Sequence, residues 1–268
     1  DGSTAQSASV ALDPTTGAVR GLVGRVGGTS DTTFRNFNYA TQGKRSPGST
    51  IKPLVVYAPA LASGWSINKD LPNKPIDYNG YTPTNYGDIE TEDVPMYQAL
   101  ANSYNIPAVY LFNQIGIQKG ISYGQKFGLN FDNVPEELGI SLGGGVTASP
   151  LQMAQAYATF ANGGEMNTAY FITKIENASG DIIATHSKKS KRVISQSVAN
   201  QMTSMMLGTF SNGSAVNANY TGYTMAGKTG TVQAEFNKDL TSDQWVIGYT
   251  PDVVMTTWIG FDKTDESH

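Results

Sequence analysis

The residues best able to do chemistry in this sequence are a serine and a lysine three positions apart, Ser49 and Lys52. On a helix, such a pair lies on one face about one turn apart. Residues 45–48 are turn formers and Pro53 is tolerated near a helix start, so we predict a helix that begins almost at Ser49. Free backbone N–H groups there favour developing negative charge. A neutral Lys52 could take the proton of the Ser49 hydroxyl, which would make this hydroxyl a nucleophile.

Two later motifs carry groups that fit such a serine. Ser103 and Asn105 form a Ser-x-Asn pattern at the joint between two predicted helices, and Lys228-Thr229-Gly230 stands in a strand-like run. A free lysine has a pKa of about 10.4, and burial and a second cation such as Lys228 would both lower the pKa of Lys52. Each residue also has a simpler explanation as a helix cap, a surface lysine or a helix stop. The three motifs in this order favour catalysis.

The elements that position these groups can be predicted from turn residues and hydrophobic periodicity. Strand-like runs flank the turn residues 13–17, which predicts a hairpin. The predicted strands are 7–12, 18–24, 224–232, 244–249 and 253–259. The predicted helices are 95–101, 107–114, 149–162 and 197–207, with Pro95 first in one, Gly116 ending another and Ser149 capping a third.

Two long stretches, 26–48 and 72–93, lack a sustained period and are predicted loops. The second is a candidate lining of a cleft. The aromatic residues that could either wall this cleft or pack in the core or rim are Trp65, Tyr78, Tyr81 and Tyr86. Strands at both ends with helices between them predict an antiparallel sheet closed by the two termini, with a helical insertion packed on it.

Composition excludes several classes of function. The 268 residues, 39% of them apolar, suffice for one large core or two closely packed lobes. A net charge of −4 argues against a nucleic-acid-binding protein. With no cysteine and only His186 and His268, a metal site or a Ser-His-Asp triad has almost no residues to use, so we expect neither metal nor cofactor. No signal peptide or membrane-spanning run is visible, and the abrupt start at Asp1 suggests a piece of a longer protein.

The three motifs together resemble those of the penicillin-interacting serine transferases. The stretches 45–53, 99–109, 145–154, 245–252 and 258–262 are more specific. They resemble the transpeptidase domain of class A (bifunctional) penicillin-binding proteins, of the Gram-positive kind. The resemblance covers essentially the whole chain. The glycosyltransferase domain and membrane anchor that such proteins carry upstream are not in this sequence.

This resemblance implies a mixed α/β domain over residues 1–268. A central antiparallel sheet of about five strands, built from both termini and flanked by helices, would carry a helical insertion of about residues 50–210 that forms an all-helical lobe, as in serine β-lactamases. The implied function is a D,D-transpeptidase that cross-links peptidoglycan stem peptides ending in D-Ala-D-Ala outside the cytoplasmic membrane. β-Lactams would acylate and inhibit it. A D,D-carboxypeptidase and a β-lactam-sensing receptor domain remain as alternatives.

The resemblance also assigns roles. Ser49 would be the nucleophile, Lys52 the general base and Ser103 a proton relay. Asn105 would hold a substrate amide, and Lys228, Thr229, Gly230 and Thr231 would form the strand that binds the substrate, chiefly through its carboxylate. The backbone N–H groups of Ser49 and Thr231 would form the oxyanion hole.

Two rival motifs deserve comparison. Residues 222–229 match the P-loop pattern Gly-x4-Gly-Lys-Thr, but residues 230–232 are poor helix starters and a P-loop needs a helix there. Pro135-Glu136-Glu137-Leu138-Gly139 resembles the Glu-x-Glu-Leu-Asn pattern of class A β-lactamases only faintly. With the leucines aligned, Pro135 replaces the water-activating glutamate. We therefore predict neither nucleotide binding nor rapid β-lactam hydrolysis.

Overall fold

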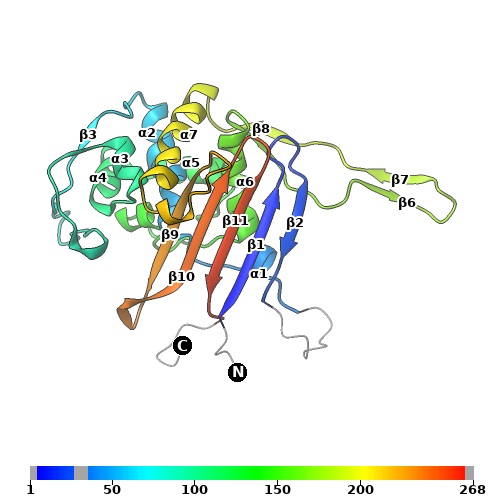
Figure 1. The fold of residues 1–268 in the computed structure, drawn as a ribbon, viewed down its shortest axis with the longest axis horizontal. Helices are drawn as coiled ribbons and strands as arrows, with labels where there is room; N and C mark the ends of the chain where they lie inside the picture. Colours follow the sequence, from blue (N-terminus) through cyan, green and yellow to red (C-terminus); the bar gives the residue numbers. More distant parts are fainter. Residues whose placement is uncertain (1–4, 27–35, 263–268) are drawn as a thin grey trace.

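The computed structural model describes residues 5–26 and 36–262. Its central element is a five-stranded antiparallel sheet with the strand order β2-β1-β11-β10-β9 (Figure 1). The strands are β1 (Gln6–Leu12), β2 (Val19–Val23), β9 (Ala226–Ala234), β10 (Asn237–Tyr249) and β11 (Val254–Gly260). The mixed α/β fold with a five-stranded antiparallel sheet is confirmed.

One face of the sheet packs on the core. Ala8, Val10 and Leu12 alternate with half-buried residues along β1, as expected of a strand with one buried face. Trp245 and Trp258 are directly opposite each other in β10 and β11, and both are buried. Helix α6 (Pro150–Ala161) covers this face and contacts β1, β10 and β11.

Helix α6 begins as the sequence predicts. The Ser149 hydroxyl accepts a hydrogen bond from the backbone N–H of Gln152, and the Gln152 side chain accepts one from the backbone N–H of Ser149. This reciprocal cap satisfies two of the free donors at the helix start, and Pro150 follows at the first helical position.

The remaining helices form a lobe beside the sheet (Figure 1). They are η1 (Gly48–Ile51), η2 (Pro53–Tyr57), α2 (Ala58–Ala62), α3 (Met96–Ala101), α4 (Asn105–Ile115), α5 (Ile117–Lys126), η4 (Leu138–Leu142) and α7 (Gln196–Ser211). Short elements connect them: α1 (Tyr39–Gln42), η3 (Tyr86–Asp88), η5 (Val216–Ala218), and the strand pairs β3 (Asp70–Leu71) with β4 (Val94–Pro95), β5 (Glu165–Asn167) with β8 (Ser190–Arg192), and β6 (Lys174–Glu176) with β7 (Ile182–Thr185).

Several boundaries differ from those predicted. Pro95 is not the first residue of α3, because its backbone is extended and pairs with Asp70. The second helix of this pair begins at Asn105 instead of Pro107, since proline is tolerated within a first turn. Helix α5 was not predicted, and α1 lies inside the predicted loop 26–48. Outside the described residues lie part of that loop (27–35) and the two ends of the chain, 1–4 and 263–268, the latter with His268.

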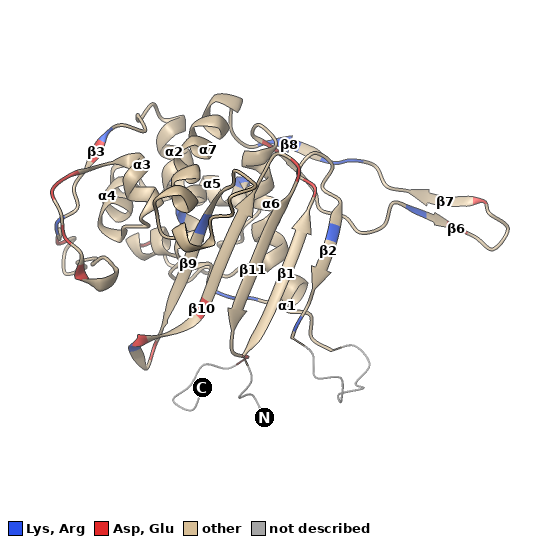
Figure 2. Ribbon diagram, in the orientation of Figure 1, with Lys and Arg blue, Asp and Glu red and all other residues tan. Residues whose placement is uncertain are grey.

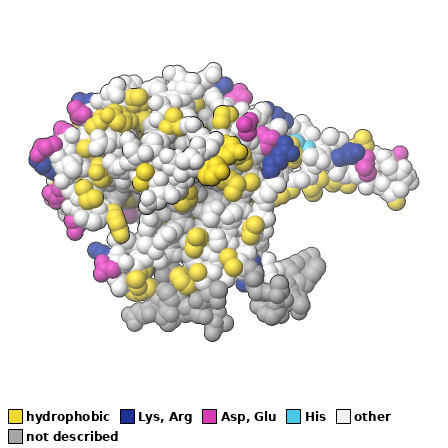
Figure 3. Space-filling view, in the orientation of Figure 1, with side chains coloured by type: hydrophobic (Ala, Val, Ile, Leu, Met, Phe, Trp, Pro, Cys, Tyr) yellow, Lys and Arg dark blue, Asp and Glu magenta, His cyan; other side chains and the backbone are white. Residues whose placement is uncertain are grey.

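The β6–β7 hairpin, also not predicted, projects from the body as an arm (Figures 1 and 3). All residues of both strands are exposed, including Ile182 and Ile183, which explains why no buried period marks them in the sequence. Acidic residues lie mostly on the outer loops of the helical lobe and at the β9–β10 turn (Figure 2). Among the described helices, none is long and apolar enough to cross a membrane.

Candidate active site

The turn that carries Ser49 is shaped by glycines. Gly48 has a φ of +50°, a left-handed conformation that glycine adopts without strain. A Cβ on Gly143 would lie 2.8 Å from the backbone N of Gly48, so the absent side chain lets the 143–145 loop pack against this turn. The predicted helix at Ser49 is present, but it opens with the 3-10 turn η1. In a 3-10 turn, residues i and i+3 eclipse, which aligns Ser49 with Lys52.

Lys52 lies where the helix changes from the 3-10 turn to the π turn η2. Pro53 and Pro59 have no N–H, so two α-helical hydrogen bonds cannot form in this stretch. Residues 54–58 are all 0% exposed, as expected of a helix that is apolar on every side. Lys52 is 0% exposed as well, which excludes the alternative that it is a surface lysine.

Ser103 lies between α3 and α4 and has a φ of +59°, the left-handed region that non-glycine residues rarely adopt. Such strain is frequent at functional sites. The alternative that Asn105 is a left-handed helix stop is wrong: the left-handed residue is Ser103, and Asn105 is the first residue of α4. The side-chain amide of Asn105 donates to the backbone carbonyl of Thr84 at 2.9 Å.

The Lys52 amino group is surrounded by acceptors from this joint. Its Nζ lies 2.7 Å from the carbonyl oxygen of Ser103, 2.7 Å from Oδ1 of Asn105 and 3.1 Å from the carbonyl oxygen of Tyr104. The Ser103 hydroxyl is 3.4 Å away. None of these acceptors is the Ser49 hydroxyl. The transfer of a proton from Ser49 to Lys52 therefore needs the amine to turn from Asn105 towards Ser49.

Lys228 reaches the same joint from strand β9. Its Nζ donates to the Ser103 hydroxyl at 2.7 Å and to the carbonyl oxygen of Thr229 at 3.0 Å. The Ser103 hydroxyl thus bridges the two lysine amines. A hydroxyl both donates and accepts, so a proton can pass between Lys52 and Lys228 through it.

Both amines lie in an environment that disfavours their charged forms. Burial lowers the pKa of Lys52 well below its ordinary value, and the neighbouring Lys228 lowers it further. Burial alone lowers the pKa of Lys228 to about 7. Lys52 can therefore act as a base near neutral pH, whereas Lys228 is protonated in part and can attract an anion.

Strand β9 is the edge of the sheet, and it contacts η1 and α7 of the helical lobe. Gly230 makes this approach close: a Cβ there would lie 2.8 Å from the carbonyl oxygen of Pro47 and 3.2 Å from the backbone N of Thr50. The Thr229 hydroxyl forms a hydrogen bond of 2.7 Å with the Ser214 hydroxyl. The edge strand and the Ser49 turn therefore form two adjacent walls.

A cleft of about 650 Å³ lies between these walls. Six of the eight predicted site residues line it, namely Ser49, Ser103, Asn105, Thr229, Gly230 and Thr231. Lys52 and Lys228 are buried behind it. None of the described residues that line the cleft is acidic. Within the described chain, no group of three His, Cys, Asp or Glu side chains could hold a metal ion.

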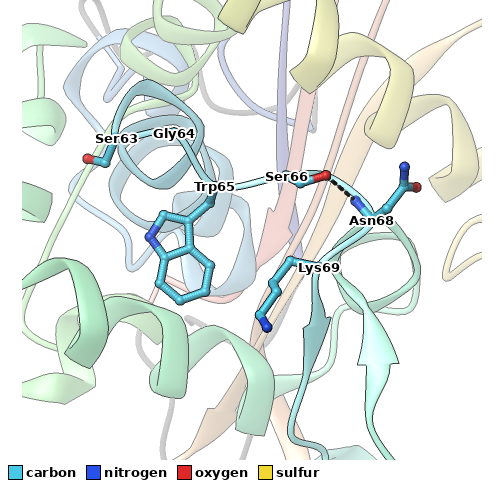
Figure 4. Close-up of a pocket in the computed structure, with 6 residues that line it drawn as sticks. All are labelled: Ser63, Gly64, Trp65, Ser66, Asn68 and Lys69. Atoms are coloured by element: carbon cyan, nitrogen blue, oxygen red, sulfur yellow. Dashed lines mark hydrogen bonds between the residues drawn. The ribbon is translucent and has the colours of Figure 1, made fainter.

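Of the four aromatic residues considered for the cleft wall, only Tyr86 lines the cleft. Tyr86 is 82% exposed. Trp65 lies instead at a separate, open pocket beside α2, lined by residues 63–66, Asn68 and Lys69 (Figure 4). None of the groups that mark the cleft as a site of chemistry lines this second pocket.

Three supports of the site were not predicted. Asn85 and Ser214 line the cleft and contact Asn105 and Thr229, respectively. The third support is an ion pair of 2.6 Å between the half-buried Arg45 and the buried Asp243. Arg45 lies four positions before Ser49 and Asp243 lies in β10, so the pair attaches the start of the Ser49 turn to this strand. Only long-range contacts reveal these supports, and no motif in the sequence marks them.

The two rival motifs have different surroundings from those their functions need. The Gly-Lys-Thr of residues 227–229 lies inside strand β9, which continues to Ala234, so no helix N-terminus is available for a nucleotide phosphate. Glu136 and Glu137 are exposed and do not line the cleft. Neither carboxylate is placed to activate a water at Ser49.

Comparisons with known proteins give a consistent result. The model of the family described as "Penicillin binding protein transpeptidase domain" matches residues 7–267. Penicillin-binding protein 2a of Streptococcus pneumoniae is 60% identical over 269 residues, which cover 100% of this chain and 37% of that protein. Penicillin-binding protein 1F of Bacillus subtilis is 37% identical, over 98% of this chain and 36% of that protein. The chain thus spans little more than a third of these relatives.

Among solved structures, the Mycobacterium tuberculosis protein PonA1 in complex with penicillin V superposes with a TM-score of 0.86. The two sequences are 26% identical over this superposition, which covers 98% of this chain and 70% of that one.

Proposed function

The chain belongs to the penicillin-binding protein transpeptidase family, and we propose that it is a serine D,D-transpeptidase domain that cross-links peptidoglycan stem peptides. The family and its class A relatives are those that the motifs predicted. One relative comes from Streptococcus pneumoniae, which is Gram-positive. The observation that carries the proposal is the Ser103 hydroxyl bridging two buried lysine amines behind a cleft lined by Ser49.

In the first step, Oγ of Ser49 attacks the carbonyl carbon of the penultimate D-Ala, and its proton goes to the neutral amine of Lys52. The carbonyl oxygen becomes an oxyanion, which the backbone N–H groups of Ser49 and Thr231 stabilise. The C–N bond then breaks. The terminal D-Ala leaves as an amine that gains its proton from Lys52 through the Ser103 hydroxyl.

Recognition of the donor peptide rests on the other wall of the cleft. The hydroxyls of Thr229 and Thr231 bind the terminal carboxylate, and the partly protonated Lys228, which is buried behind the cleft, attracts it. Asn105 binds a substrate amide once Lys52 turns away from its Oδ1. Gly230 lets the edge strand lie close to the turn that carries Ser49.

In the second step, an amine from a neighbouring stem peptide attacks the Ser49 ester. Lys52 takes the amine proton and returns a proton to Oγ of Ser49 as the ester bond breaks, which leaves an amide cross-link and the free enzyme. A β-lactam imitates the donor and forms the same ester with Ser49. We propose that this reaction takes place on the outer face of the cytoplasmic membrane. Parts of the full-length protein outside this sequence would attach the domain to the membrane.

Intact mass after exposure to a fluorescent penicillin tests the proposal. The wild-type chain should gain one penicilloyl mass and Ser49→Ala should gain none. Ser46→Ala is the matched control, because it removes a hydroxyl three residues away that does not line the cleft and bonds only to the carbonyl oxygen of Gly143 and the N–H of Gly48 among the described residues. Ser49→Ala should remain within about 0.5 kcal/mol of wild type, because Ser49 lies inside η1 and is not its N-cap, which is Pro47. If folded Ser49→Ala is still labelled, Ser49 is not the nucleophile.

Product analysis with a D-Ala-D-Ala peptide separates the alternatives. With an amine acceptor, a transpeptidase gives a new amide. A carboxypeptidase gives the shortened acid with or without the acceptor. A receptor domain is acylated once by the β-lactam and does not turn over the peptide, with or without the acceptor.

A further inference from the structure

Asn85 lies in the irregular segment between β3 and β4, yet its side chain is almost completely buried, with 4% of the residue exposed. Its carboxamide forms four hydrogen bonds. Oδ1 accepts from the backbone N–H of Asn105 at 2.7 Å and of Ile106 at 3.1 Å. Nδ2 donates to Oδ1 of Asn73 at 2.8 Å and to the carbonyl oxygen of Ile89 at 2.7 Å. Both ends of the buried amide are therefore satisfied.

These bonds complete the start of helix α4. The first N–H groups of a helix lack partners within it, and Tyr104, the residue before α4, supplies no capping side chain. The N–H of Tyr104 donates to Ala99, and Pro107 has no N–H. Only the N–H groups of Asn105 and Ile106 remain, and both donate to Asn85. A side chain 20 residues upstream thus does the work of a local cap.

The segment holds Asn105 at its side chain as well as at its backbone. The neighbouring Thr84 accepts the Asn105 side-chain amide at 2.9 Å, which fixes the direction of Oδ1. That oxygen lies 2.7 Å from Nζ of Lys52. The backbone and the side chain of Asn105 are therefore both oriented by residues 84 and 85.

We propose that Asn85 is a positioning residue for acyl transfer: by capping α4, it sets the place of Asn105, which holds the resting Lys52 amine and binds the substrate amide once this amine turns towards Ser49. The inference rests on the proposed function of Ser49 and Lys52. Asn85 touches neither lysine, so its effect on the reaction passes through Asn105.

Asn73 provides a matched control. It is fully buried in the same segment and bonds to Asn85 and Thr91, but it has no bond to α4. Asn73→Ala and Asn85→Ala each remove one buried carboxamide from this segment. Only the second removes the acceptor of the α4 N–H groups. Asn85→Asp keeps this acceptor and loses the donor to Asn73 and Ile89.

The test measures the rate constant of acylation by a fluorescent penicillin, each variant at its own optimum pH and below its own melting temperature. The optimum is used because a new carboxylate at position 85 changes the pH profile. Asn85→Ala should be slowed about 10- to 100-fold, the scale expected when a catalytic group is displaced by up to about 1 Å. Asn73→Ala should stay within about threefold of wild type, although it lowers the melting temperature. Asn85→Asp should keep the cap of α4, but its new carboxylate lines the cleft and repels the carboxylate of the penicillin.

Backbone amide hydrogen exchange is the second readout and does not depend on catalysis. The amides of Asn105 and Ile106 should lose protection in Asn85→Ala and keep most of it in Asn73→Ala. Acylation of Asn85→Ala within about threefold of wild type, or an equal loss in Asn73→Ala, would overturn the positioning role. If Asn85→Ala does not fold, Asn85→Ser decides, because it adds no charge and its shorter side chain withdraws the acceptor from the two N–H groups: acylation within about threefold of wild type refutes the inference. A wild-type chain that forms no Ser49 adduct would refute the proposed function, while the exchange data would still test the cap.

Discussion

The closeness of strand β9 to the Ser49 turn can be tested by adding one methyl group, in Gly230→Ala. Gly230 does not have the positive φ that favours glycine, so alanine fits the backbone of the strand. The new Cβ would lie 2.8 Å from the carbonyl oxygen of Pro47, 2.8 Å from Cγ2 of Thr50 and 3.2 Å from its backbone N. Two of these three atoms belong to the backbone of the turn that carries Ser49. They cannot move aside as the end of a flexible side chain would.

The size of the effect follows from these distances. Contacts below 3.0 Å essentially never occur for real Cβ atoms, so the strand and the turn must separate by at least a few tenths of an ångström. Overpacking of this kind costs about 1–3 kcal/mol of stability. A displacement of about 1 Å at a reaction centre costs about 100-fold in rate, so about 0.5 Å should cost about tenfold. The oxyanion hole proposed between Ser49 and Thr231 would widen by the same amount.

The measurement is the acylation rate constant with a fluorescent penicillin, together with urea denaturation. Gly21→Ala is the control, because among the described residues a Cβ on this other sheet glycine would meet only the Ala11 side chain, at an ordinary 3.8 Å. We expect Gly230→Ala to acylate about tenfold more slowly while Gly21→Ala acylates normally. If Gly230→Ala loses stability but acylates within about twofold of wild type, the spacing of these two walls does not control the reaction.

Three further predictions follow from the electrostatics and the surroundings of the site. Lys228→Met removes the charge that lowers the pKa of Lys52, so this pKa rises. The acid limb of the profile of acylation rate against pH should therefore move to higher pH. If this limb does not move, Lys228 acts only in binding. The penicilloyl adduct should persist for many minutes to hours in a mass time course, because Glu136 and Glu137 lie outside the cleft; loss within seconds would reveal a water-activating group. Mg-ATP at millimolar concentration should leave the melting temperature unchanged, because β9 continues past the Gly-Lys-Thr residues; a clear rise would restore nucleotide binding.

The sequence predicts the site better where residues lie close together in the chain. Ser49 and Lys52 share one turn, and Ser103 and Asn105 share one joint, so local pattern and turn chemistry suffice to place them. Lys228 was connected to them by its resemblance to a family motif. The bonds of Asn85 to α4 and of Arg45 to Asp243 span 20 and 198 residues, and no local preference encodes them.

Helix α5 shows how packing can hide an element from local prediction. Gly120 and Gly124 lower its helix propensity by about 1 kcal/mol each. A Cβ on Gly120 would lie 2.1 Å from the Phe112 ring and 2.7 Å from the carbonyl oxygen of Val55, and one on Gly124 would lie 2.5 Å from the Phe131 ring. The glycines are there because α5 packs directly against its neighbours. Tertiary contact thus requires the residues that local propensity disfavours.

The pairing of β1 with β11 also sets the order in which this chain can fold. The two strands are joined side by side although contacts such as Ser7 to Trp258 span 251 residues. Closing a loop of this length costs about 5 kcal/mol of chain entropy before any contact repays it. Contacts within the helical lobe, such as α4 with α5 and α2 with η2, are far more local and can form sooner. Ser49 and Lys52 would then be in place before the late strands deliver Lys228. During refolding, the capacity for penicillin labelling should therefore appear after most of the helix signal, once β9 has packed against η1 and α7.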